Sequence, residues 1–283
     1  MPTVIDTTEK KQAVRKFWGT RPCGVIHSKN PVESPEFFQD TEAYRFRIHT
    51  DWNKPFLKDA IGFDKHTGKF MLEVGSGIGV DSLEWKRNGN RVISLDYNFP
   101  SCRLTRSRLE DAGYDGAYLN GDAENLPFPD ATFDLVYSFG VLHHTPDTPK
   151  TIREVYRCLK PGGEAIIMLY YKWSAKVLGE ILLGFGLRKG ALFQLRSMQE
   201  LINQYTEFDS QFEGNICPLT QVFSKREIRK MFNQFDDVSI DLHYLWPGHY
   251  GPARHFLPLV PKGIRQNLPS RMGWNAIIKA VKK

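Results

Sequence analysis

Short apolar segments alternate with helical segments between Phe70 and Tyr171, and this alternation restricts the fold more than any other feature of the sequence. Five segments have the length and apolar content of buried strands, namely FMLEV, RVISLD, GAYLNGD, FDLVYSFG and EAIIMLYY. Helical spacing separates them over about residues 80–88, 101–112 and 148–159. Buried strands that alternate with helices are typical of a parallel sheet covered on both faces. We therefore expect an α/β fold.

The rest of the sequence divides into parts on either side of this alternation. Residues 1–65 have helical spacing and predict an N-terminal helical cap, which precedes a core at residues 66–171. Residues 172–223 read as an insertion of helices interrupted by glycines, which could act as a lid. Residues 224–283 contain one more helix and two strands, which would complete the sheet as an antiparallel pair.

The composition is that of an ordinary soluble globular protein, with 283 residues of which 25% are charged. The sequence contains no run of about 18 uncharged apolar residues and no apolar N-terminal segment with basic flanks, so we expect a cytoplasmic protein without a signal peptide or membrane span. The four cysteines lie far apart, without a C-x-x-C pair. They predict reduced thiols and no metal site.

The formal net charge of +6 is unevenly distributed. From Leu242 onward the sequence has no Asp or Glu but seven Lys or Arg residues. Such a segment can attract an anionic substrate, a membrane surface or nucleic acid, and a solvated basic surface is the alternative. Peripheral contact with a membrane is therefore left open by the sequence.

A glycine-rich loop, Gly75, Gly77 and Gly79, follows the first expected strand directly. In a dinucleotide-binding site such a loop and the following helix N-terminus face a pyrophosphate. Here Glu73 lies two residues before the first glycine, at the carboxyl end of the strand. A buried carboxylate there opposes a diphosphate and suits a cationic ligand. S-adenosylmethionine is such a ligand, because its sulfonium and ammonium groups are positive and its only anion is one carboxylate.

Two further acids follow the next two expected strands. Asp96 ends the second strand, about twenty residues after the loop, which is the usual position of an acid that accepts hydrogen bonds from ribose hydroxyls. Asp122 follows the third strand, where it could reach an adenine amino group with the Ala123 backbone beside it. Together with Glu73 these residues predict a site for S-adenosylmethionine. A dehydrogenase that binds NAD is the alternative, because it shares the fold and the acid after the second strand.

The chain resembles the class I S-adenosylmethionine-dependent methyltransferases, particularly the group of ubiquinone and menaquinone biosynthesis enzymes and related small-molecule methyltransferases. The resemblance rests on LEVGSGIG, LDYN, NGDAENLPFPDATFDLVYSFGVLHHTPD and REVYRCLKPGGEAIIMLY, which together span about residues 70–170. It implies a Rossmann-like, mostly parallel sheet of seven strands, methyl transfer, and cofactor contacts at the glycine loop, the acids and the segment after Phe139. The predicted cofactor-binding set is Glu73, Gly75, Ser76, Gly77, Gly79, Asp96, Tyr97, Asp122, Ala123 and Phe139.

Methyl transfer is an in-line displacement in which the protein mainly aligns two reactants, and a general base is needed only when the acceptor must lose a proton. His143 and His144 follow the fourth strand at the edge where ligands bind, so either could be that base. Alternatively, they orient the loop or contact the cofactor. Tyr170 and Tyr171 end the fifth strand, and one of them should face the acceptor. We predict Tyr170 as a further catalytic candidate and Tyr171 as an acceptor contact.

The N-terminal cap supplies three more candidate acceptor contacts, Trp18, Tyr44 and Arg45. An arginine could pair with a carboxylate or phosphate of the acceptor. The alternative for aromatic residues at helical spacing is core packing.

The predicted function is methyl transfer to a small-molecule acceptor. A lipid-linked or phosphorylated acceptor is an alternative, because the apolar VLGEILLGFGL lies beside several cations, an arrangement found at membrane interfaces. A non-catalytic cofactor-binding scaffold is a further alternative. By family resemblance, a nucleic-acid substrate is disfavoured, because YSFGVLHH contains no Asn-Pro-Pro-aromatic sequence. Glycines are expected to interrupt the insertion's helices and to permit a lid motion, namely Gly179, Gly184, Gly186 and Gly190.

Overall fold

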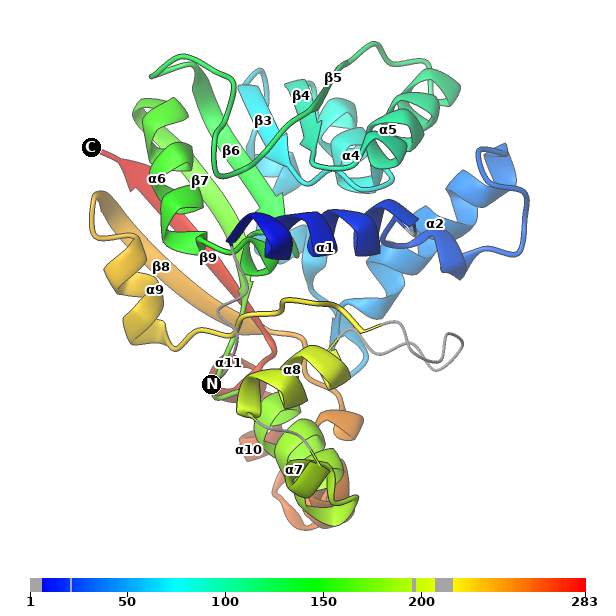
Figure 1. The fold of residues 1–283 in the computed structure, drawn as a ribbon, viewed down its shortest axis with the longest axis vertical. Coiled ribbons are helices and arrows are strands. Elements are labelled where there is room, and N and C mark those ends of the chain that lie inside the picture. Colours follow the sequence, from blue (N-terminus) through cyan, green and yellow to red (C-terminus); the bar gives the residue numbers. More distant parts are fainter. Residues whose placement is uncertain (1–6, 21, 195–196, 207–215) are drawn as a thin grey trace.

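A computed structural model describes residues 7–20, 22–194, 197–206 and 216–283. Its centre is a seven-stranded sheet in the order β5-β4-β3-β6-β7-β9-β8 (Figure 1). The strands are β3 (Phe70–Val74), β4 (Arg91–Asp96), β5 (Ala117–Asn120), β6 (Phe133–Phe139), β7 (Leu159–Tyr170), β8 (Phe235–His243) and β9 (Asn275–Lys282). This sheet confirms the predicted fold class.

The strand pairing explains where a ligand site can form. β3 pairs in parallel with β4 on one side and with β6 on the other, so the strand order reverses at β3. β4 also pairs in parallel with β5, and β6 with β7. β9 pairs antiparallel with both β7 and β8, as the sequence predicts for the two final strands. Ligands of open α/β sheets bind at the carboxyl edge of the sheet where the order reverses.

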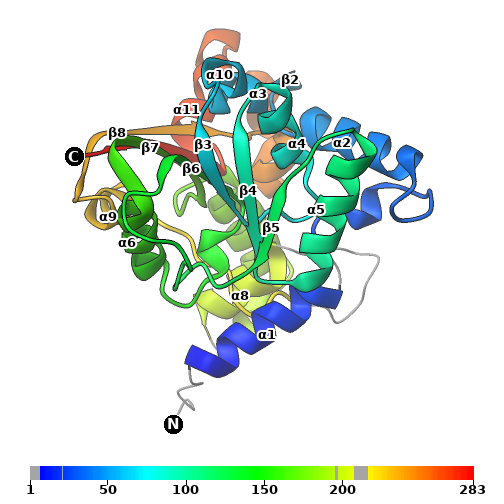
Figure 2. The ribbon, with the colours of Figure 1, turned by 90° about the horizontal axis from the view of Figure 1, so that it is seen from above.

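Helices cover both faces of the sheet (Figure 2). One face carries α3 (Leu57–Ile61), α4 (Val80–Arg87) and α5 (Phe99–Asp111), and the other carries α6 (Thr148–Cys158) and α9 (Lys225–Met231). Asp147 is the N-cap of α6, because it accepts a hydrogen bond from the backbone N–H of Lys150 at 2.9 Å.

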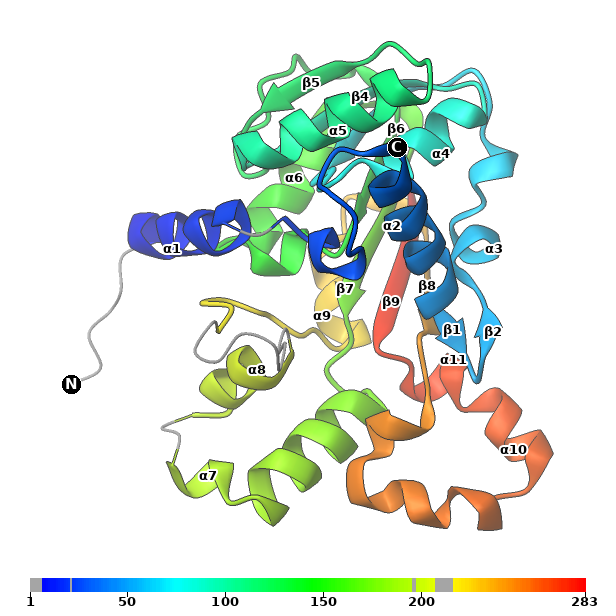
Figure 3. The same cartoon turned by 90° about the vertical axis from the view of Figure 1, so that its right-hand side faces the viewer.

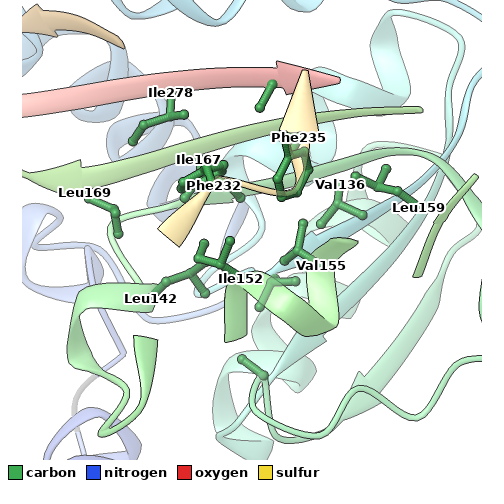
Figure 4. Packing of buried hydrophobic residues seen from close by; sticks show 14 of the residues in the cluster. Val136, Leu142, Ile152, Val155, Leu159, Ile167, Leu169, Phe232, Phe235 and Ile278 are labelled. Carbon is green, nitrogen blue, oxygen red and sulfur yellow. The ribbon is translucent and has the colours of Figure 1, made fainter. Parts of the chain in front are cut away.

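Consecutive residues of the central strands pack on opposite faces of the sheet, because the side chains of a strand alternate between its two faces. Leu72, Val136, Ile167 and Ile278 belong to one buried cluster with residues of α6 and α9. Figure 4 shows Val136, Ile167 and Ile278 in this cluster. Their neighbours Met71, Leu135, Ile166 and Ile277 pack with α3 and with Trp85 of α4. Both faces are therefore apolar, which accounts for the nearly continuous apolar runs in the sequence.

The N-terminal part places two helices across the carboxyl edge of the sheet. They are α1 (Thr7–Thr20) and α2 (Pro35–Ile48), with the short η1 (Val25–His27) between them. The short elements β1 (Thr50–Asp51), β2 (Lys54–Pro55) and η2 (Phe63–Lys65) come after α2. The buried Arg108 of α5 fixes α2, because its guanidinium donates to the Phe38 carbonyl at 2.9 Å and to the Thr41 hydroxyl at 2.6 Å. α1 has no fully buried residue, and its contacts with the core include an ion pair of Lys11 with Asp122 and the packing of the Trp18 ring beside His144.

Two segments that are far apart in the sequence form a second group of helices beyond the carboxyl edge of the sheet (Figure 3). We call this group the helical lobe. It consists of η4 (Lys176–Arg188), α7 (Ala191–Gln194), α8 (Met198–Thr206), η5 (Pro247–Leu259), α10 (Lys262–Asn267) and α11 (Pro269–Met272). The expected insertion therefore packs against part of the C-terminal segment.

The glycines of the insertion do not break its first helix, and that prediction is wrong. η4 is a π-helix that continues through Gly179, Gly184 and Gly186. A Cβ atom at Gly179 would lie 2.7 Å from the His249 carbonyl oxygen, which is too close. Gly179 thus lets the η4 backbone touch the η5 backbone, and it serves packing in this structure. Gly190, with φ 74°, follows the end of η4 as expected.

Candidate active site

A cavity of about 400 Å³ lies at the carboxyl ends of β3, β4 and β6, where the strand order reverses. The sheet edge forms its floor, and α1 and α2 supply one wall. The start of η4, the carboxyl ends of β7 and β8 and the first residue of β9 supply another wall. The core, the cap and the helical lobe thus all contribute to one site. Its volume is that of a pocket for small organic ligands.

The glycine loop after β3 forms one end of the cavity. Gly75, Gly77 and Gly79 have φ values of 83°, 56° and 76°, which only glycine adopts at little cost. A Cβ atom at Gly75 or Gly79 would collide with neighbouring residues, whereas one at Gly77 would meet no atom within 4 Å. Gly77 therefore presents bare backbone to open space in the cavity, where a ligand can approach it closely.

Asp96 faces this loop from the end of β4. Its carboxylate accepts hydrogen bonds from the backbone N–H groups of Gly77 and Asn98, both at 2.9 Å. Burial raises the pKa of Asp96 to about 6, and these N–H groups limit the rise. The side chains of Ser101 and Asn98 also donate hydrogen bonds to this carboxylate. Ligand hydroxyls that bind Asp96 would share or replace these side-chain hydrogen bonds.

Glu73 is buried below the glycine loop. Ser82 of α4 donates a hydrogen bond to it, and the Ser82 hydroxyl also lies 2.8 Å from that of Ser94. Burial and the nearby Asp81 carboxylate raise the pKa of Glu73 well above its ordinary value. A cationic group in the cavity would favour the ionised form of Glu73 and would itself be stabilised.

Asp81, in the first turn of α4, is a site residue that the sequence reasoning missed. Its carboxylate accepts from Arg45 Nε at 3.0 Å and from the Tyr137 hydroxyl at 2.6 Å. Burial by itself would raise the pKa of Asp81, but the Arg45 guanidinium holds that pKa below its ordinary value. Arg45 also lies over the ring of Phe139, 4.3 Å from its centroid. Because Arg45 is paired with Asp81, it is a poor anchor for an anionic acceptor.

α1 covers the end of the cavity near β5. Lys11 of α1 donates to Asp122 at 2.6 Å and contacts Glu124 at 2.7 Å. Burial opposes ionisation of Asp122, yet the hydrogen bond from Lys11 keeps its pKa below the ordinary value. This ion pair ties the N-terminal helix to the predicted adenine-binding acid.

Aromatic side chains surround the opposite end of the cavity. Tyr170, at the end of β7, stacks on Trp274 with ring centroids 4.0 Å apart. The lining at this end also includes Phe139, Met168 and Tyr244. Such walls suit a flat or apolar acceptor and exclude water.

Asn275 is the polar exception in this aromatic end. It begins β9, where it pairs in register with Tyr170 and His243, and it lines the cavity. Its side chain is 1% exposed, and within the described residues neither amide atom has a hydrogen-bond partner. A buried amide without partners is costly, so a ligand group that both donates and accepts would satisfy it.

The two candidate histidines occupy different environments. His144 lines the cavity, and its Nδ1 lies 2.7 Å from the Leu219 carbonyl oxygen, which assigns the proton to Nδ1 and leaves Nε2 as the basic nitrogen. His143 is fully buried beside Tyr170, outside the lining, and burial lowers its pKa well below the ordinary value. His49, which the sequence reasoning did not single out, lines the cavity with its pKa lowered to about 3 by burial and Arg45. It is therefore neutral near pH 7.

Most of the predicted residues meet in this one cavity. Those in its lining are Trp18, Tyr44, Arg45, Glu73, Gly75, Ser76, Gly77, Asp96, Tyr97, Asp122, Ala123, Phe139, His144 and Tyr170. Gly79, His143 and Tyr171 lie outside the lining, and the Tyr171 backbone N–H donates to the Trp274 carbonyl at 2.8 Å. Across the described ranges, no cluster of three or more His, Cys, Asp or Glu side chains could hold a metal ion.

Comparison with known proteins identifies the central part of the chain. Residues 72–167 match the Methyltransferase domain family. The chain is 35% identical over 133 residues to the ubiquinone/menaquinone biosynthesis C-methyltransferase UbiE of Enterobacter sp. (strain 638). That alignment covers 45% of this chain and 51% of UbiE, so the chain spans about half the length of the curated relatives it matches.

Solved structures share the fold at low sequence identity. The magnesium protoporphyrin IX methyltransferase ChlM of Synechocystis PCC 6803 with bound S-adenosylmethionine aligns with a TM-score of 0.56 and 12% identity over the full length of both chains. The [4+2]-cyclase SpnF aligns with a TM-score of 0.52 and 14% identity over 96% of this chain and 92% of SpnF. Because the fold occurs with different reactions, the reaction has to be argued from the site.

Proposed function

We propose that this chain, whose residues 72–167 form a methyltransferase domain of the class I S-adenosylmethionine-dependent type, transfers a methyl group to a small-molecule acceptor. The observation that carries the proposal is the single cavity in which an acidic, glycine-lined end adjoins an aromatic end. When bound, S-adenosylmethionine supplies an electrophilic methyl group on a sulfonium that is already a good leaving group.

The acidic end fits this cofactor. The space beside the Gly77 backbone is open, so the methionine part of the cofactor can approach this backbone closely. Asp96 can accept from the ribose hydroxyls in place of the Ser101 and Asn98 side chains, and Asp122 lines the part of the cavity that would hold the adenine amino group. Glu73 places a buried carboxylate near the cationic part of the cofactor. A diphosphate would instead meet the carboxylates of Glu73 and Asp96, so NAD is disfavoured.

The aromatic end would position the acceptor. The faces of Tyr170 and Trp274 can hold a flat apolar body, and Asn275 can donate to and accept from one polar group on it. We infer an acceptor with a ring or conjugated apolar part that bears a hydroxyl or amide-like group. Its alignment and the exclusion of water would account for most of the rate enhancement.

His144 is the best-placed general base for an acceptor that must lose a proton. It lines the cavity, and the contact of its Nδ1 with the Leu219 carbonyl oxygen orients the ring. His143, which lies outside the cavity lining, is not assigned this role. Tyr170 is assigned to the acceptor wall.

Calorimetric titration with S-adenosylmethionine and with NAD tests the cofactor. Selective binding of S-adenosylmethionine is expected, and selective binding of NAD would refute the proposal. A screen of hydroxylated aromatic compounds, with mass detection of the gain of one methylene, would then identify acceptors. Transfer to none of them by a protein that binds the cofactor would favour the non-catalytic scaffold.

A further inference from the structure

The helical lobe concentrates positive charge. Its segments, residues 176–194, 198–206 and 247–272, contain seven Lys or Arg residues and two acids, Glu180 and Glu200, which gives them a formal net charge of +5, against +6 for the whole chain. The seven are Lys176, Arg188, Lys189, Arg254, Lys262, Arg265 and Arg271. The cations of residues 176–194 lie beside those of residues 247–272, because η4 packs against η5 through the contact of Gly179 with His249 and Tyr250. Figure 3 shows η4 and η5 together in the helical lobe, so cations from two distant parts of the sequence belong to one lobe.

Large apolar side chains on the same helices are exposed. Phe193 of α7 is 85% exposed, Phe256 and Leu259 of η5 are 67% and 79% exposed, and Ile264 of α10 is 56% exposed. On η4, Leu183 and Leu187 are exposed four residues apart, and Trp246 is exposed just before η5. These exposed apolar side chains all belong to the helical lobe or directly adjoin it in sequence, and such a concentration is expected of an interaction surface.

A small second cavity of about 220 Å³ lies between η4 and η5. Its cationic or titratable lining residues are Arg188, Lys189, Arg254 and His255, with Glu180 as the one acid. Burial raises the pKa of Glu180, which weakens its negative charge in this cavity. The lining therefore favours an anionic group such as a phosphate.

We propose that the helical lobe is a docking surface for membranes that contain anionic phospholipids, with the second cavity taking a headgroup phosphate. Cations attract such a membrane, and exposed aromatic and aliphatic side chains enter its interface. Nucleic acid would satisfy the cations but would leave Phe193, Phe256 and Leu259 in water. Across the described residues, no helix is long and apolar enough to span a bilayer, so the docking is peripheral.

The docked lobe would bring the membrane near the active-site cavity. Lys176 begins η4 and also lines that cavity, where its Nζ lies 5.1 Å from the ring centroid of Trp274. The proposal concerns a surface outside the cofactor site, so vesicle binding tests it independently of methyl transfer.

The test is flotation of the full chain with vesicles of phosphatidylcholine alone or mixed with phosphatidylglycerol. Binding to the mixed vesicles alone is expected, and it should weaken as salt is raised. A double substitution R188Q/K189Q should weaken binding about 25-fold, since each cation near an anionic surface contributes about fivefold. The matched control R229Q/K230Q removes two adjacent exposed cations from α9 and should leave vesicle binding unchanged.

A second pair of variants tests the apolar contribution. Phe256→Ser should reduce vesicle binding, whereas Phe99→Ser, a change at an equally exposed phenylalanine of α5, should not. Equal losses in each test variant and its control would overturn the proposal, because they would indicate a non-specific effect of charge or apolarity. Failure of the unaltered chain to float with mixed vesicles would also overturn the proposal. If the chain instead binds duplex DNA but no vesicles, and R188Q/K189Q abolishes the DNA binding, the surface is a nucleic-acid site.

Discussion

The raised pKa of Asp96 makes cofactor binding depend on pH. Ribose hydroxyls donate hydrogen bonds best to an ionised carboxylate, and the proton on Asp96 competes with them. Burial raises the pKa of Asp96 in the free protein to about 6. Binding of S-adenosylmethionine should therefore be fully developed above about pH 7 and should weaken as the pH falls through 6.

The magnitude follows from this pKa. If only the ionised form binds, the apparent dissociation constant is multiplied by one plus the ratio of protonated to ionised Asp96. With a pKa of about 6 this factor is about 11 at pH 5 and about 1.1 at pH 7, a difference of about tenfold or about 1.4 kcal/mol. The methionine ammonium and carboxylate keep their charges over this interval, so they do not contribute.

Isothermal titration calorimetry at these two pH values measures the effect, with circular dichroism to establish that the protein is folded at both. Asp96→Asn keeps the shape but removes the titrating group, so its weaker binding should change little with pH. An affinity of the parent protein that is equal at both pH values would refute the reasoning. A tenfold dependence that persists in Asp96→Asn would assign the effect to another acid, with Glu73 the first candidate because its pKa is also raised.

Three further outcomes are expected. Gly77→Val should weaken S-adenosylmethionine binding more than tenfold by calorimetry, because it fills the open space and strains a backbone at φ 56°, and unchanged affinity would mean that the ligand does not approach this loop. Arg45→Ala should lower the free energy of unfolding by about 3 kcal/mol in urea titrations, since it leaves Asp81 buried without its cation, and a loss under about 0.5 kcal/mol would contradict a stabilising pair. Asn275→Leu should raise the stability of the free protein by about 1 kcal/mol, because it removes an unpaired buried amide, while reducing methyl transfer to any acceptor found; lower stability would show that the amide is satisfied.

The central sheet was predictable because its signals are local. The apolar runs that became β3, β4 and β6 alternate with helical spacing, and their glycine loop and acids lie at strand ends, so parallel pairing alone brings Gly77 and Asp96 together. The N-cap of α6 is local in the same sense, because Asp147 accepts from a backbone N–H three residues away.

Features that depend on contacts between distant segments were not predictable from these patterns. Asp81 had the position of an ordinary first-turn acid, and its pairing with Arg45 follows only from the packing of α2 on α4. Asn275 reaches the site because β9 pairs with β7, about a hundred residues earlier, and nothing in WNAIIKA indicates it. Gly179 looked like a helix breaker because the sequence does not reveal the η5 backbone that crosses it.

The placement of β9 between β7 and β8 has a consequence for how the chain is synthesised. Within the described residues β8 pairs only with β9, which leaves the ribosome later. Until then the nascent chain carries an open edge at β7 and an unpaired β8, both of which can pair with other chains. Residues 275–282 therefore close the sheet after most of the cofactor site has already been made, and chaperones that shield strand edges would act on this protein before β9 has been synthesised.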